Sequence, residues 1–109
     1  MKGKYLGEFE ELVLLMVGLL GEHAYGINIV EEIRSRMNRK VNLSGVHSTL
    51  YRMEDKGYLT SSFGGATSER GGRKKRIFHL TLSGRNILES TQSKRTAVWQ
   101  LIVSKQGNE

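Results

Sequence analysis

The chain has 109 residues, of which 38% are hydrophobic and 26% charged, with a net charge of +6 and neither cysteine nor proline. This length fits one domain with a small core that a partner subunit would help to cover. The lack of cysteine excludes a disulfide scaffold and thiol chemistry, and the three histidines lack the spacing of a helical metal site, so we expect neither metal nor cofactor.

The first two periodic segments predict helices over 7–21 and 24–38, each with an apolar stripe at helical spacing. The apolar run over 12–20 is too short to span a bilayer, and acidic residues on both sides of it argue against a signal peptide. We therefore expect a soluble, cytoplasmic protein with no membrane partner.

Residues 44–57 predict a third helix, with Ser44 as its N-cap and Gly57 at its end. The connection before it, over 39–43, is either a loop or a brief strand. Val46, Leu50 and Met53 share one face of this helix. The other face carries hydrogen-bonding groups, namely Ser44, Ser48, Tyr51, Arg52 and Asp55, with His47 and Thr49 on its flanks.

Two segments, 58–63 and 76–82, alternate in polarity and predict a β-hairpin whose tip is a glycine-rich loop over 64–75. The net charge is concentrated here: of 17 basic residues, five lie within 70–76, so the remaining 12 nearly balance the 11 acidic residues. Such a cluster attracts a polyanion through counterion release, whereas the alternative is a solvated loop without a role. The five are Arg70, Arg73, Lys74, Lys75 and Arg76.

The last segment, 82–104, predicts a helix that begins after Thr81 as N-cap. Its apolar stripe is interrupted by the polar residues 93–96. The stripe resumes with Val98 and Ile102, and Trp99 lies at its edge.

Three helices, a hairpin and a final helix predict a mainly α protein with a small β-hairpin. A compact three-helix unit with a short connection before its third helix is the helix-turn-helix arrangement, and a hairpin directly after it makes a winged helix. We expect the winged-helix domain to span 5–82 and the C-terminal helix to span 83–105.

The segment SGVHSTLYRMEDKGYL (44–59), followed by a basic loop and by RIFHLTLSGRNIL (76–88), resembles the PadR family of bacterial transcriptional regulators. The resemblance covers roughly residues 5–90 and includes Tyr25-Gly26. Many members carry a proline near the wing, and this chain has none. The most specific matches are Gly45, Leu50-Tyr51-Arg52, Lys56 to Leu59, and the Leu-Thr-x-x-Gly run from Leu80 to Gly84.

The resemblance implies a homodimer that binds a near-palindromic operator in double-stranded DNA, usually as a repressor. It implies that the third helix enters the major groove, that the wing touches the backbone or minor groove, and that the helix over 83–105 serves as the dimerisation helix. The chain resembles the short group of the family, in which some members bind a small hydrophobic or aromatic effector near the dimer interface.

We expect two sets of functional residues. The first binds DNA: the start of the third helix reads base edges, while its tyrosine, its arginine and the wing bind phosphates or a guanine edge. Packing against the hairpin is the alternative for Tyr51, and Asp55 is expected either to lie at the rim of this face or to pair with Arg52 or Lys56. The DNA-binding set is Ser44, His47, Ser48, Thr49, Tyr51, Arg52, Arg70, Arg73, Lys74 and Lys75.

The second set is expected at a dimer interface or an effector pocket, and it comprises Trp99, Val98, Ile102 and Phe9. Trp99 is either an interface anchor or the wall of a ligand pocket, and Phe9 has the core as its alternative. We expect no enzymatic activity, because no P-loop, G-x-S-x-G or HExxH motif is present. The rival to operator binding is a winged-helix module that contacts protein or RNA.

Overall fold

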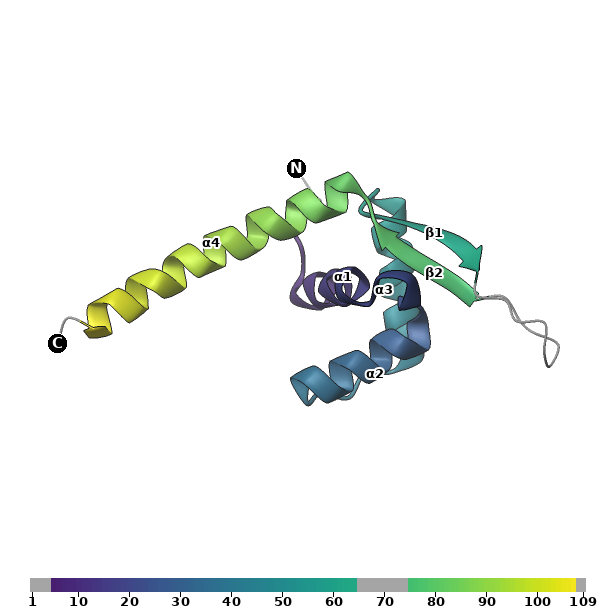
Figure 1. Ribbon diagram of the computed structural model, residues 1–109, viewed down its shortest axis with the longest axis horizontal. Coiled ribbons are helices and arrows are strands. Elements are labelled where there is room, and N and C mark those ends of the chain that lie inside the picture. The colour runs from purple at the N-terminus through teal and green to yellow at the C-terminus, as the bar shows by residue number, and fades with distance from the viewer. Residues whose placement is uncertain (1–4, 65–74, 108–109) are drawn as a thin grey trace.

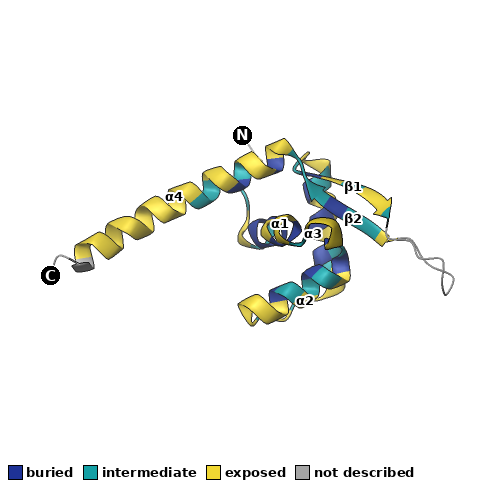
Figure 2. Cartoon of the chain, in the orientation of Figure 1, coloured by how far each residue is buried: buried dark blue, intermediate teal, exposed yellow. Residues whose placement is uncertain are grey.

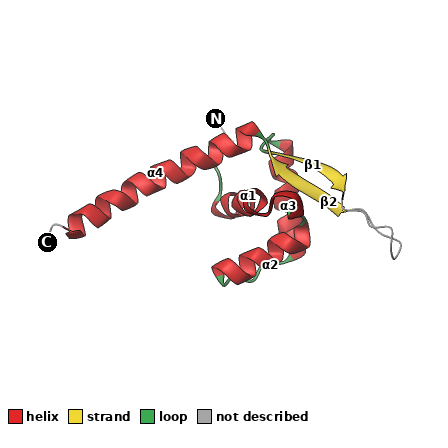
Figure 3. Cartoon of the chain, in the orientation of Figure 1, coloured by secondary structure: helices red, strands yellow, loops and turns green. Residues whose placement is uncertain are grey.

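The computed structural model describes residues 5–64 and 75–107. Figure 1 shows the shorter helices packed together, a hairpin beside them and a long helix that leaves the body. The elements in chain order are α1 (Glu8–Leu20), a 3-10 turn η1 (Gly21–His23), α2 (Gly26–Met37), α3 (Leu43–Asp55), β1 (Leu59–Gly64), β2 (Lys75–Leu80) and α4 (Leu82–Gly107). The predicted class, mainly α with a small β-hairpin, is confirmed, and Figure 3 separates the two kinds of element.

The core lies where α1, α2 and α3 meet the inner face of the hairpin. Val46, Leu50 and Met53 are fully buried, as the spacing of α3 predicts. Their neighbours in the core include Val13, Leu14, Ile29, Ile33 and Phe78. The apolar patterns predicted for 7–21, 24–38 and 58–63 extend beyond this core, since Leu19, Met37 and Phe63 are exposed.

Helix α3 begins one residue earlier than predicted, and its N-cap is Asn42 rather than Ser44. The Asn42 side-chain oxygen accepts a hydrogen bond from the backbone N–H of Gly45 at 2.7 Å. Residues 39–42 form no strand. Both asparagine and serine cap helices well, so only the hydrogen bond distinguishes the two positions.

Replacing Asn42 with alanine should lower the free energy of unfolding by about 1 kcal/mol, because it removes the cap of α3. Urea denaturation followed by circular dichroism measures this change. The matched control is Ser44→Ala, which should change stability by less than about 0.5 kcal/mol. Equal losses in the two variants would contradict the assignment of the cap.

The hairpin is antiparallel, and its second strand is hydrogen-bonded to the segment that precedes α2. Its register runs from Leu59 opposite Leu80 to Gly64 opposite Lys75. The Phe78 N–H donates to the Ala24 carbonyl at 2.9 Å, which fixes β2 beside the start of α2. Thr81 is the predicted cap of α4: its hydroxyl accepts from the Gly84 N–H at 3.0 Å. In this packing, Arg76 at the start of β2 lies beside Tyr51 of α3.

Helix α4 is buried only near its beginning, as Figure 2 shows. Its contact with α1 includes Glu11, a residue that is only 3% exposed. The Glu11 carboxylate accepts a hydrogen bond from the Gln92 amide and pairs with Arg95 at 2.6 Å. Among the described helices, none combines the length and apolar character that a transmembrane span requires.

Candidate nucleic-acid interface

Helix α3 presents a polar face to solvent. Ser44, Ser48, Tyr51, Arg52 and Asp55 are all exposed, and His47 is half-buried at the edge of the face. The opposite face is the core face described above. The structure therefore brings together on one surface most of the residues that the sequence analysis assigned to this helix.

Thr49 is a correction to that assignment. Its side chain is only 3% exposed, and its hydroxyl donates to the Gly45 carbonyl at 3.0 Å. Helix α3 packs against α1, α2 and β1, so its buried arc is wider than the apolar stripe alone indicates. Thr49 lies within this arc, and its prediction as a base-reading residue is wrong.

The Tyr51 ring packs against the hairpin and yet stays 43% exposed. Its centroid lies 5.9 Å from that of His47, with an angle of 28° between the ring planes, and 6.1 Å from that of Phe78 on β2. The Arg76 guanidinium lies 4.9 Å from the same ring. The packing holds the aromatic side chain in place without removing it from the surface.

Arg76 belongs to the strand and links α3 to both strands of the hairpin. Its guanidinium pairs with Glu54 at 3.0 Å and donates from Nε to the Ser61 hydroxyl at 3.0 Å. Ser61 in turn donates to Glu54 at 2.8 Å. Sequence reasoning missed Glu54 and Ser61, because neither lies near Arg76 along the chain. This network fixes the orientation of the hairpin relative to α3.

Arg52 pairs with Glu10 of α1, at 3.1 Å, rather than with Asp55, which was one of the alternatives expected for that aspartate. Burial raises the pKa of the Glu10 carboxyl, but the Gly7 N–H and the Arg52 guanidinium outweigh it and hold that pKa below its usual value. The bond uses Nε of Arg52, so the Nη atoms can still donate to an outside acceptor. Arg52 thus lies at the rim of the polar face.

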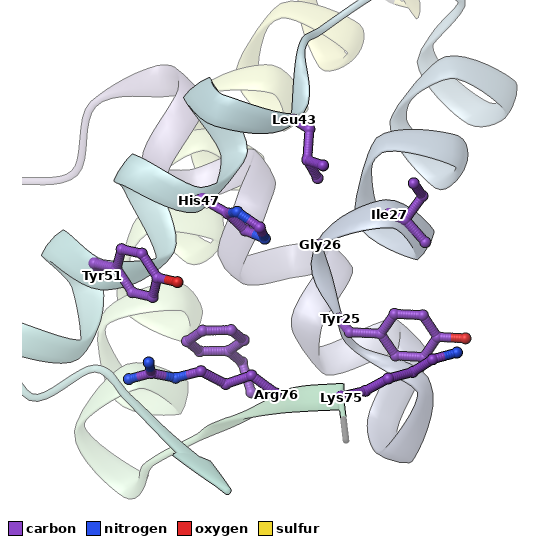
Figure 4. Close-up of a pocket in the computed structure, with 9 residues that line it drawn as sticks. Tyr25, Gly26, Ile27, Leu43, His47, Tyr51, Lys75 and Arg76 are labelled. Atoms are coloured by element: carbon purple, nitrogen blue, oxygen red, sulfur yellow. The ribbon is translucent and has the colours of Figure 1, made fainter. Parts of the chain in front are cut away.

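A pocket of about 460 Å³ lies between the start of α2, α3 and the start of β2 (Figure 4). Lys75 lines the pocket, with its ammonium 4.5 Å from the centroid of the Tyr25 ring. None of the lining residues is acidic. No local pattern could have revealed this site, since it joins three distant segments. The lining residues are Tyr25, Gly26, Ile27, Leu43, His47, Tyr51, Lys75, Arg76 and Phe78.

The structure locates the other predicted residues as follows. Lys75 is exposed at the start of β2, whereas Arg70, Arg73 and Lys74 lie outside the described residues. Val98, Trp99 and Ile102 are exposed on α4. Phe9 packs against the core, with the Arg39 guanidinium 5.3 Å from its ring centroid. Over the described ranges, no group of three or more histidine or acidic side chains could hold a metal ion.

A helical trio, an exposed polar third helix and an adjoining hairpin define a winged helix-turn-helix protein. The chain matches the model of the transcriptional regulator PadR-like family over residues 14–90, and it belongs to that family. Members of this family are transcriptional regulators rather than enzymes. No curated protein matches the chain.

Solved structures show the same fold. A PadR-like transcriptional regulator from Bacillus cereus matches with a TM-score of 0.72 and 20% identity, over 93% of each chain. A PadR-like transcription factor from Bacteroides fragilis matches with a TM-score of 0.70 and 16% identity, over 88% of this chain and 87% of that one. Bacillus subtilis PadR, solved in complex with operator DNA, matches with a TM-score of 0.64 and 18% identity, over 78% of this chain and 46% of that one.

Proposed function

We propose that the protein is a sequence-specific repressor that binds a near-palindromic operator as a homodimer. The observation that carries this proposal is the exposed polar face of α3, which lies beside the start of β2 with its basic Lys75. A helix with short hydrogen-bonding side chains fits the major groove, and a neighbouring basic hairpin fits the phosphate backbone. The operator complex of the Bacillus subtilis relative supports the same use of the fold.

In this proposal each side chain acts according to its place on the surface. Ser44, His47 and Ser48 lie at the start of α3 and contact base edges, because this end of a recognition helix points into the groove. Tyr51 and Arg52 lie further along the same face and donate to phosphates. The basic residues of the hairpin neutralise further phosphates, and they are Arg70, Arg73, Lys74 and Lys75.

The homodimer places two copies of α3 in successive major grooves, ~34 Å apart. We assign dimerisation to the helix over 83–105, since its C-terminal half exposes Val98, Trp99 and Ile102. Repression follows when the bound dimer blocks transcription. A small hydrophobic or aromatic effector would relieve it by binding better to a dimer with a different helix spacing.

Binding to the protein's own upstream region, measured by fluorescence anisotropy against a scrambled duplex and an RNA of equal length, tests the proposal. Specific binding is expected for the upstream duplex alone. Equal affinity for all three nucleic acids, or no binding, would contradict operator recognition and favour an interaction module.

Replacing Lys74 and Lys75 with alanine should weaken binding to every sequence and lower the slope of log K against log salt by about 1 for each phosphate that is no longer neutralised. Anisotropy titrations at a series of salt concentrations measure the slope. The control is Lys105→Ala, near the end of α4 and far from α3 (Figure 1), which should leave the slope unchanged. An unchanged slope in the double variant would remove these two lysines from the interface.

A further inference from the structure

The pocket beside α3 has an aliphatic wall. The hydrogen bonds to base edges and the phosphate contacts of the proposed function leave this wall without a role. Ile27 of α2 is 52% exposed and Leu43 of α3 is 39% exposed. Both line the pocket: Leu43 lies next to His47, and Ile27 lies across from His47 on the other side of Gly26, as Figure 4 shows. Exposing aliphatic side chains to water is unfavourable, so a partner that covers them gains free energy.

The position of this wall is set by the close approach of α2 to α3. A Cβ atom on Gly26 would lie 2.3 Å from Nε2 of His47 and 3.0 Å from Cδ1 of Leu43. Both side chains therefore rest against the first residue of α2, where only glycine leaves room for them. This contact holds the imidazole and the leucine in place before any partner binds, which lowers the entropy lost on binding.

The charges around the pocket favour an anionic partner with an apolar group. Lys75 and Arg76 are the charged lining residues, and Arg76 is already paired with Glu54. Lys75 thus supplies the positive charge of the lining, above the Tyr25 ring. In duplex DNA, thymine is the base that presents an apolar group in the major groove, namely its 5-methyl group.

We propose that Leu43, with Ile27 and His47, holds the 5-methyl group of one thymine in each half-site of the operator. Leu43 is then a specificity-determining residue, in addition to the hydrogen-bonding side chains of α3. This inference rests on the proposed function, because the methyl group reaches the pocket only when α3 lies in the major groove. Contact with a deoxyribose, which every nucleotide carries, would give no such discrimination.

The experiment starts with selection of bound duplexes from a random library by the full-length protein. Each thymine of the selected sequence is then replaced singly by deoxyuridine, which removes only the methyl group. At one thymine per half-site, we expect affinity to fall about fourfold, which corresponds to the burial of one methyl group. The expected loss is about sixteenfold when both half-sites are changed.

The same titrations with Leu43→Ala and with Ile27→Ala assign the effect to the pocket. In Leu43→Ala the difference between thymine and deoxyuridine should vanish at that position, and in Ile27→Ala it should shrink. The control is Leu82→Ala, an exposed leucine at the start of α4 outside the pocket, which should keep the full difference. Circular dichroism confirms that each variant is folded.

Two results would overturn the inference while leaving operator binding intact. One is a selected operator in which no thymine responds to deoxyuridine. The other is a response that persists undiminished in Leu43→Ala. A selection that enriches no duplex at all would overturn the proposed function and this inference together, so the two failures are distinguishable.

Discussion

Replacing Gly84 with alanine should lower the free energy of unfolding by about 3 kcal/mol, a large share of the stability of a small domain. A Cβ atom at this buried position would lie 2.1 Å from the backbone oxygen of Tyr58 and 3.0 Å from its carbonyl carbon. That oxygen also accepts a hydrogen bond from the Thr81 N–H, at 3.1 Å. Backbone atoms cannot rotate away, so α4 must shift from the hairpin. Urea denaturation measures the loss.

Gly18→Ala is the matched control for this prediction. Its Cβ atom would lie 3.0 Å from Cδ1 of Leu80, which is the end of a flexible side chain and not backbone. Alanine also favours a helix over glycine by about 1 kcal/mol, which offsets the crowding. We expect a net change below about 1 kcal/mol in either direction. Similar stabilities for the two variants would show that the start of α4 tolerates displacement, contrary to the tight contact at Gly84.

The Leu-Thr-x-x-Gly run from Leu80 to Gly84 shows how far a sequence pattern can predict structure. The pattern indicated the family, and Thr81 was predicted as the cap of α4, which is confirmed. The reason for the glycine is visible only in the packed structure, because Tyr58 lies 26 positions away along the chain. Local hydrogen bonds were therefore predictable, and the close approach of the backbone was not.

The same distinction explains what was right and wrong about α3. Its apolar spacing located Val46, Leu50 and Met53 in the core and left the serines, Tyr51 and Arg52 exposed. Thr49 was misplaced, because the width of the buried arc depends on how many elements pack around a helix. The pocket was missed for a related reason: Ile27, Leu43 and Lys75 come together only through tertiary packing.

Glu11 of α1 connects this helix to α4. Acidic residues in the first turn of a helix complement its dipole, which suits the exposed Glu8 of α1. Glu11 is instead buried, accepts a hydrogen bond from Gln92 and forms an ion pair with Arg95. The Glu11 carboxylate is buried although the Arg95 side chain is exposed, and a buried carboxylate without its partners would be costly, so this contact anchors α4 to the winged-helix body. Beyond Arg95, nothing in the described part of the same chain covers the apolar side chains of α4.

Replacing Val98 and Ile102 together with aspartate should convert the proposed dimer to a monomer and weaken operator binding by about 100-fold or more. The two residues lie one turn apart on α4 and are both exposed. Charges at these positions would have to be desolvated in a helix–helix interface. The monomer would then bind each half-site alone and lose the gain from simultaneous engagement. Sedimentation velocity and fluorescence anisotropy measure the two effects.

The control adds the same charge to the same helix in the variant Gln100→Asp/Ser104→Asp. These residues are also one turn apart and exposed, but they lie on the opposite side of α4. They should leave both assembly and operator affinity near the wild-type values. If the Val98→Asp/Ile102→Asp variant remains a dimer, the face that bears Val98 and Ile102 is not the interface. If both double variants dissociate, added charge and not this apolar face decides assembly, because the two variants gain the same charge and only one of them loses apolar side chains.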